Sequence, residues 1–375
     1  MKKIWVWITI IVVLALVVTL MVIWPREEPK QIRIGAILPL TGDLATYGEN
    51  ARDGVNLLCE QTNAKGGING KKVVVIFEDS KGQPNPAVAA MRKLTEIDDV
   101  VAVVGCVGSS PLLAIAPIAN KNKIVVVSPA ASSPDITNAG PYIYRVWPSD
   151  VFEADRMADY IKQQRINKVA LLYVNNDYGR AMEAEFKERT KGSDIAVVVA
   201  ENFEQNTIDV RTQLTKIKES NTEAIYLISY PKDSVIILRQ YKEIGINSKI
   251  LSTSSFEDPQ ILKEVGDIAE GAVFTSPIPP AENDHVVLAF QKDYEERFGK
   301  KPGLVADYGY DALKVILEAM NISNDISRKG VSNGMQRIKD LKGATGLINF
   351  DENGDVKKPA GIKVVKSGEY DWIDK

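Results

Sequence analysis

The sequence predicts an α/β fold with two doubly wound, parallel-sheet lobes. Short apolar segments alternate with segments of helical period through almost the whole chain after residue 30. The apolar segments lack strict polar–apolar alternation, which is typical of strands covered by helices on both faces. Finally, the chain has 375 residues, and a single core seldom grows past about 250–300 residues, so we expect two domains.

The expected elements follow in chain order. Strands are predicted at 32–38, 73–77, 100–105, 124–127, 169–174, 195–199, 224–228, 250–252 and 272–275. Helices are predicted at 51–62, 88–95, 152–164, 181–190, 210–219, 234–244, 286–298 and 307–320. Asn85 and Pro86 are expected to open the second helix as cap and first-turn proline. Segments 346–350 and 362–365, with turns at 351–354 and 366–369, predict hairpins near the end.

The first thirty residues predict a membrane anchor. Lys2 and Lys3 precede an uncharged segment, 4–24, whose length of about 21 residues matches a full span. Tryptophans lie near both of its ends, and no small-residue cleavage site follows. We therefore favour an uncleaved single-pass anchor with the remainder outside, over a cleaved signal. In either case the rest of the chain is exported.

Composition excludes several classes of function. The net charge of −3 provides no basic face, so we expect no nucleic-acid partner. One histidine, His285, and two distant cysteines, Cys59 and Cys106, are too few for a zinc site or a His-based triad, so we expect no metal and no enzyme. No dinucleotide or phosphate-loop motif is present, so no cofactor is expected. Two unpaired thiols are favoured over a disulfide.

Two aspartates remain as catalytic candidates. Asp79 and Asp177 each follow a predicted strand and could act as general bases. No partner group is identifiable by spacing. We therefore favour structural roles for both.

Two neighbouring strand-end loops predict an anion site. After the strand that ends at Gly105, two glycines precede Ser109 and Ser110, and Pro111 suits a first helical position. Unpaired N–H groups at such a helix start, with the Ser109 hydroxyl, suit a carboxylate. The loop 128–133 ends the next strand in the same way. A plain capped helix is the alternative.

A Tyr–Gly pair recurs in both halves of the chain. Tyr47 and Gly48 follow the first strand, and Tyr178 and Gly179 follow the strand at 169–174. Such a tyrosine can lay its ring along an apolar ligand while its hydroxyl remains polar. Ordinary packing is the alternative for each.

Several short motifs in order resemble one known family. They are GAILPLTG (35–42) with Tyr47-Gly48, NAKGGING (63–70), VGCVGSS (104–110), SPAAS (128–132), YRVWPSD (144–150), NDYG (176–179), YGYDA (308–312) and FDENGD (350–355). Together they extend over about 32–372. The chain resembles type I periplasmic binding proteins, specifically the branched-chain amino acid group of ABC importer receptors.

The resemblance implies two lobes joined by three crossings, near Ser149, at 276–279 and at 343–346. Lobe 1 would comprise 31–149 plus 278–344, and lobe 2 would comprise 150–277 plus 345–375, after the anchor and linker at 1–30. The ligand would lie in the cleft between them. The strand-end loops and the resemblance together predict these ligand-site residues: Tyr47, Ser109, Ser110, Ala130, Ala131, Ser132, Tyr178, Tyr230 (or Ser229 by a one-residue shift) and Ser254.

One position departs from the family pattern. Ser254 falls nearest to a glutamate that takes the ligand ammonium in the amino-acid binders. A buried ammonium needs a countercharge or several good acceptors. Either Glu257, Asp258 or Asp307 substitutes, or the ligand lacks an ammonium.

The resemblance implies a binding function and a transport partner. We expect an extracytoplasmic solute-binding protein that captures a branched-chain amino acid or related small carboxylate for ABC permease subunits. The alternative keeps the fold and makes the protein a sensing subunit that reports ligand occupancy to a separate receptor.

Overall fold

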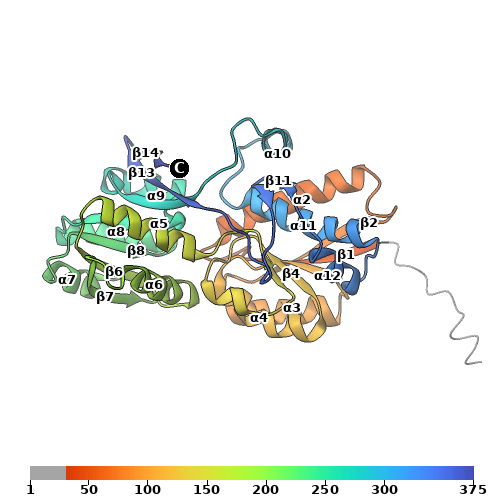
Figure 1. The fold of residues 1–375 in the computed structure, drawn as a ribbon, viewed down its shortest axis with the longest axis horizontal. Coiled ribbons are helices and arrows are strands. Elements are labelled where there is room, and N and C mark those ends of the chain that lie inside the picture. The colour runs from red at the N-terminus through yellow and green to blue at the C-terminus, as the bar shows by residue number, and fades with distance from the viewer. Residues whose placement is uncertain (1–30) are drawn as a thin grey trace, which may run out of the picture. The chain divides into compact units, whose positions relative to one another are not determined.

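The computed structural model describes residues 31–375 (Figure 1). The predicted anchor, at 1–30, lies outside the described residues. Within 31–375 no helix is both long and apolar enough to cross a bilayer. Residues 32–375 form one compact unit, in which two large sheets define two lobes.

The first lobe is built on a five-stranded sheet of order β2-β1-β3-β4-β5. Its pairs β1–β3, β3–β4 and β4–β5 are parallel. The strands are β1 (Gln31–Leu38), β2 (Lys72–Asp79), β3 (Ala102–Gly105), β4 (Val125–Ser128) and β5 (Ile143–Arg145). The three-residue β5 is absent from the sequence prediction because so short a segment shows no period.

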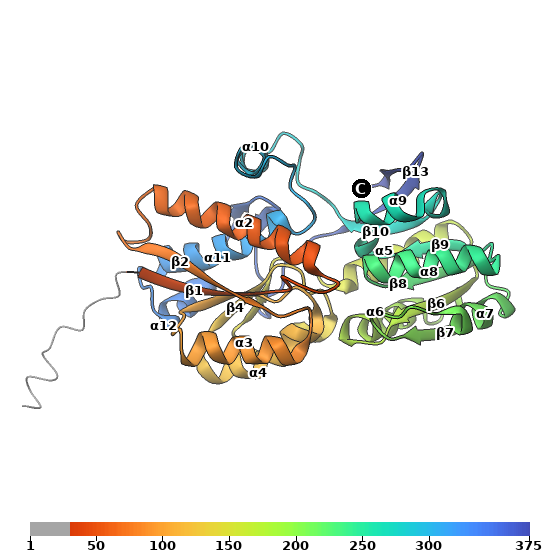
Figure 2. The same cartoon turned by 180° about the vertical axis from the view of Figure 1, so that it is seen from behind.

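Helices cover both faces of this sheet. Ile34 and Ala36 pack into one core cluster, whereas Ile37 packs into another, as strand alternation requires. The first cluster lies under α2 (Ala45–Ala64), α11 (Ala306–Ser323) and α12 (Arg328–Met335), and the second under α3 (Pro84–Glu96) and α4 (Ser109–Asn122). Figure 2 shows α2 and α11 on one side of the sheet and α3 and α4 on the other.

Three of these helices begin two or more residues earlier than predicted, and the largest difference is in α2, which starts at Ala45 and not at residue 51. Helix α3 starts at Pro84, after Gln83, and not at Asn85 and Pro86. Helix α4 starts at Ser109, so Pro111 occupies its third position. Prolines are tolerated throughout a first helical turn, where N–H groups have no intrahelical partner, so a proline alone does not fix the first residue.

The second lobe repeats the same strand order and adds an antiparallel edge. Its sheet runs β14-β13-β10-β9-β8-β6-β7. The parallel strands are β6 (Lys168–Val174), β7 (Ala196–Phe203), β8 (Ala224–Ile228), β9 (Lys249–Ser252) and β10 (Val273–Pro277). The helices are α5 (Asp150–Gln163), α6 (Asp177–Thr190), α7 (Arg211–Glu219), α8 (Pro231–Ile244) and α9 (Pro259–Val265). In each sheet the second strand in the sequence lies at the edge, next to the first strand, and the later strands follow on the first strand's other side. The strand order therefore reverses next to the first strand, and doubly wound folds bind ligands at the carboxyl ends of the strands at such a reversal.

The C-terminal segment differs from the predicted lobe division. Strand β11 (Leu341–Gly343) pairs with β12 (Gly346–Ile348), and Ile348 and Val356 pack in the core of the first lobe. The chain enters the second sheet only at β13 (Ala360–Lys366), which pairs with β14 (Glu369–Asp374). The crossing therefore lies near Pro359 and not at 343–346, because apolar side chains and an ion pair from Asp355 to Arg145 hold 346–356 on the first lobe.

The remaining elements are short or lie at the edge of the lobes. They are the 3-10 turns η1 (Pro134–Asn138), η2 (Ser254–Phe256) and η3 (Gly266–Ala269), and helix α10 (His285–Phe298). The Asp284 carboxylate caps α10 by accepting from the Val286 N–H at 2.8 Å. His285, the single histidine, is the first residue of that helix.

Candidate ligand-binding site

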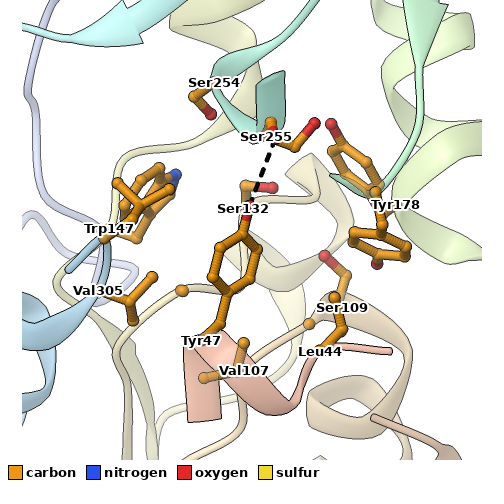
Figure 3. A pocket seen from close by; sticks show the side chains of 14 residues that line it. Leu44, Tyr47, Val107, Ser109, Ser132, Trp147, Tyr178, Ser254, Ser255 and Val305 are labelled. Carbon is orange, nitrogen blue, oxygen red and sulfur yellow. Dashed lines mark hydrogen bonds between the residues drawn. The ribbon is translucent and has the colours of Figure 1, made fainter. Parts of the chain in front are cut away.

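A cavity lies where the loops at the carboxyl ends of strands from both sheets meet (Figure 3). Its polar and aromatic lining residues are Tyr47, Ser109, Ser132, Trp147, Tyr178, Tyr230, Ser254 and Ser255. Its remaining lining residues are Leu44, Val107, Gly108, Ala130, Leu304 and Val305. This is the position at which doubly wound folds bind ligands.

The two Tyr–Gly pairs occupy equivalent places in the lobes. Tyr47 lies in the first turn of α2, and Tyr178 lies in the first turn of α6. A Cβ added to Gly48 would lie 1.9 Å from the Pro39 carbonyl oxygen, and one added to Gly179 would lie 1.9 Å from the Val174 carbonyl oxygen. Glycine therefore lets each helix start press against the end of the preceding strand, which places the tyrosine beside it at the cavity.

Both tyrosine hydroxyls form hydrogen bonds with the segment that follows β9 in the second lobe. The Tyr47 hydroxyl donates to the Ser255 carbonyl oxygen at 3.3 Å, a contact between the lobes that Figure 3 shows as a dashed line. The Tyr178 hydroxyl lies 2.7 Å from the Thr253 hydroxyl, and its ring stacks on Tyr230 with centroids 5.4 Å apart. Burial raises the pKa of Tyr47 and of Tyr178 well above the ordinary value, so both hydroxyls keep their protons.

Replacing Gly179 with alanine should lower the free energy of unfolding by about 1–3 kcal/mol, because the added methyl overlaps the Val174 carbonyl. Helix propensity alone predicts the opposite sign, a gain of about 0.5–1 kcal/mol. Chemical denaturation of the variant and the parent measures this difference. A stabilised variant would contradict the close packing described here.

Ser109 provides a hydrogen-bond donor at one end of the cavity. Its hydroxyl oxygen accepts from the Ser133 N–H at 3.1 Å, which leaves its own O–H free to donate. Ser109 is the first residue of α4, where the N–H groups of the opening turn lack intrahelical acceptors. This combination suits a carboxylate.

Two residues of the predicted site do not line this cavity. The Ser110 hydroxyl accepts from the Asp177 N–H at 3.1 Å and so joins the lobes. The Ala131 N–H is satisfied by the Ser128 hydroxyl at 3.0 Å, and Ala131 is fully buried. Because α4 starts at Ser109 rather than after Ser110, the second serine projects away from the cavity.

A buried arginine, which the sequence analysis gave no role, positions the Ser132 loop. Arg145 is fully buried and forms a two-point ion pair with Asp355, with N–O distances of 2.6 and 2.8 Å. Its Nη1 donates to the carbonyl oxygens of Ser132 and Ser133 at 2.9 and 2.8 Å. Arg145 and Asp355 lie 210 residues apart, so no local pattern could have paired them.

The apolar wall of the cavity was also missed. Trp147 follows β5 and packs on Tyr308 with ring centroids 4.5 Å apart. Leu44, Val107 and Val305 complete the wall. Trp147 belongs to the YRVWPSD motif, and its place directly after β5 was the signal that could have identified it.

The catalytic candidates have structural roles. Asp79 accepts from the Thr41 hydroxyl at 2.5 Å and from the N–H groups of Lys81 and Leu40 at 2.8 and 2.9 Å, and these contacts outweigh its desolvation and lower its pKa. Asp177 pairs with Arg180 at the surface. In the described part of the chain no cluster of three or more metal-ligating side chains occurs, and both Cys59 and Cys106 are unpaired thiols.

A cavity between two doubly wound lobes, lined by hydroxyls, aromatic rings and an apolar wall, defines a ligand-binding protein. A family model described as periplasmic binding protein matches residues 31–369. The chain therefore belongs to the periplasmic binding protein family.

Relatives agree with this assignment. The chain is 27% identical over 328 residues to a leucine-, isoleucine-, valine-, threonine- and alanine-binding protein of Pseudomonas aeruginosa, covering 87% of each chain. A leucine-binding protein of Thermotoga maritima superposes with a TM-score of 0.83 at 28% identity, over 91% of this chain and 97% of the other. The branched-chain amino acid transporter binding protein of Streptococcus pneumoniae, solved with isoleucine, gives a TM-score of 0.83 at 25% identity, over 92% and 100%.

Proposed function

We propose that this protein binds a branched-chain amino acid, or a related small carboxylate, in the cavity and delivers it to the permease of an ABC importer. The observation that carries the proposal is the composition of the cavity wall, where serine hydroxyls and an apolar surface occur together. A ligand with one polar end and one aliphatic end matches such a lining.

Ser109 would hold the ligand carboxylate at the start of α4, and Ser132 and Ala130 would lie beside it on the loop after β4. Tyr47, Tyr178 and Tyr230 would enclose the ligand body. Leu44, Val107 and Val305 would contact the aliphatic side chain. These roles involve binding alone, so we infer that the protein performs no reaction on its ligand.

We further propose that residues 1–30 anchor the protein in the cell membrane by a single span, with both lobes on the extracytoplasmic side. The uncharged segment 4–24, preceded by Lys2 and Lys3, supports this placement. An anchor of this kind would keep the binding protein beside its permease. Membrane fractionation tests this placement. We expect the protein to remain in the membrane fraction in alkaline salt and to be released by detergent.

The ligand is tested by titration calorimetry of the full chain in detergent against leucine, isoleucine and valine. We expect saturable heat with at least one of them. Absence of heat with all three, and with their amine-free carboxylic acid counterparts, would refute the proposal.

Replacing Ser109 or Ser132 with alanine should each weaken binding by about 1.5–3 kcal/mol, because each removes a hydroxyl contact to a charged group. That corresponds to about a 10- to 100-fold rise in Kd. Calorimetry measures the affinity, and circular dichroism checks that each variant is folded. Ser110→Ala, whose hydroxyl bonds to Asp177 outside the cavity lining, is the matched control with a smaller expected effect.

A further inference from the structure

The position resembling the ammonium-binding glutamate of the amino-acid binders is Ser254, and none of the expected substitutes lines the same cavity as Ser254. Glu257 pairs with Lys363 and accepts from the Ser276 hydroxyl at 2.7 Å. Asp258 caps α9 by accepting from the Gln260 N–H at 2.8 Å. Asp307 accepts from the Tyr308 N–H at 2.9 Å and, with Glu257 and Asp258, lines an adjoining cavity that shares Tyr47, Trp147 and Leu304 with the first.

A different carboxylate lies directly behind Ser254. Glu153, on α5, is 1% exposed. It accepts from the Ser254 N–H at 2.9 Å, from the Ser254 hydroxyl at 2.5 Å and from the Thr275 hydroxyl at 2.6 Å. Across 31–375 it forms no ion pair with a lysine, arginine or histidine. The carboxylate is therefore held against the cavity wall by neutral donors.

A second buried acid lies one helical turn earlier. Asp150 is 1% exposed, and its Oδ2 is buried without a hydrogen-bond partner. Its backbone N–H donates to the Ser132 carbonyl oxygen at 2.8 Å, which ties it to the other cavity-lining loop. Two acids thus lie behind the cavity wall, Glu153 at Ser254 and Asp150 beside the Ser132 loop. A buried carboxylate oxygen without a hydrogen-bond partner, such as Asp150 Oδ2, is an exception in folded proteins.

Burial raises the pKa of both acids, and the charge of Glu153 raises the pKa of Asp150 further. Burial is the main cause of the raised pKa of Tyr178, and the charges of Asp150 and Glu153 raise that pKa further. Both carboxylates therefore lie near a ring that lines the cavity. A positive charge placed here would favour the ionised acids.

The hydroxyl of Ser254 has a fixed polarity as a result. Because its proton is donated to Glu153, its oxygen can only accept from a group in the cavity. Ser109 has the reverse arrangement, since it accepts from Ser133 and has a proton to donate. The cavity therefore has an accepting, acid-backed end and a donating end, which matches an ammonium and a carboxylate.

We propose that Glu153, acting through the Ser254 hydroxyl, supplies the negative charge that holds the ammonium group of the ligand. The site then selects α-amino acids over carboxylic acids that lack the amine. This inference rests on the proposed function and adds to it the residue that provides the charge for recognition of the ligand's ammonium group. Glu153 is a positioning and charge-supplying residue, since Ser254 makes the contact.

The test compares matched ligands that differ only in the amine: leucine with 4-methylpentanoate, isoleucine with 3-methylpentanoate, and valine with 3-methylbutanoate. Calorimetry of the full chain in detergent gives the affinity ratio within each pair. We expect the parent to prefer the amino acid by about 100-fold or more, and Glu153→Gln and Ser254→Ala each to lower that ratio by about 10- to 100-fold. Ser109→Ala should weaken both members of a pair and leave the ratio unchanged.

A rescue variant separates charge from structure. Glu153→Gln combined with Ser254→Glu moves the carboxylate from behind the wall to the cavity itself, and it should regain the preference for the amino acid. Should Glu153→Gln fail to fold, as judged by thermal unfolding, Ser254→Ala decides the question, because it removes one hydroxyl only.

The outcomes are distinct. If the parent binds both members of a pair equally, or if the ratio survives in both Glu153→Gln and Ser254→Ala, the inference is wrong while the binding function stands. If the parent binds no member of any pair, the proposed function itself fails.

Discussion

Replacing Arg145 with methionine should lower the free energy of unfolding by about 3–5 kcal/mol. Removing one partner of a buried ion pair leaves the other charge without compensation. Here Asp355 would lose both of its guanidinium contacts, and the carbonyl oxygens of Ser132 and Ser133 would lose their donor. Urea unfolding followed by circular dichroism measures the loss.

Arg156→Met is the matched control, because Arg156 pairs with Asp374 at the surface, where the carboxylate is 60% exposed. Surface pairs contribute about 0–1 kcal/mol. We expect the Arg145 variant also to bind ligand more weakly, because the Ser132 loop loses its support. Equal losses of stability in the two variants would show that the Arg145 network does not stabilise the lobe.

Replacing Asp233 with asparagine should stabilise the protein at pH 8 by up to about 4 kcal/mol and change its stability little at pH 4. Asp233 is 2% exposed, and its Oδ2 has no hydrogen-bond partner. Burial raises its pKa from 3.8 to about 7, and the charge of Asp43 adds to this, while the Asn206 N–H and Lys232 oppose it. The expected energy follows from about three pKa units at about 1.4 kcal/mol each.

The sign follows from proton linkage. Between about pH 4 and pH 7 the folded state keeps a proton on Asp233 that the unfolded state has released, so the free energy of unfolding falls as pH rises and levels off above pH 7. The asparagine variant has no carboxyl group at this position, so it does not show this fall in the free energy of unfolding. Other buried acids also titrate, so the quantity to measure is the difference between variant and parent at each pH.

Asp194→Asn, at an exposed position of the same lobe, is the control for the loss of one carboxylate charge. A constant difference between Asp233→Asn and its parent across this range would mean that Asp233 titrates alike in both states.

The elements with a clear local pattern were predictable from sequence. The runs at 32–38 and 169–174 lie within one residue of β1 and β6 because each buries side chains on both faces. Ser109 and Ser132 line the cavity, and they were chosen because loops at the carboxyl ends of parallel strands are where doubly wound folds bind ligands. Family membership followed from many short motifs in a fixed order.

What the sequence could not show depends on distant contacts. Glu153 lies in the first turn of a helix, where acids commonly stabilise the helix end, so nothing marked it as a partner of Ser254, 101 residues away. The lobe division erred at 345–359 because hairpin residues reveal nothing about which sheet they join. The starts of α3 and α4 were misplaced because several residues near each start suit a cap.

The first lobe takes its core from both ends of the chain, and this has a consequence for the order of folding. Strand β1 begins at Gln31, yet α11 and Val356, which help to bury it, come roughly 300 residues later, and contacts at that separation form late. The second lobe draws its parallel strands from one continuous stretch, 168–277. The second lobe is therefore expected to fold first. Until α11 and Val356 are in place, β1, which is synthesised earliest, keeps an apolar face uncovered. A newly made chain is most prone to aggregate at this stage.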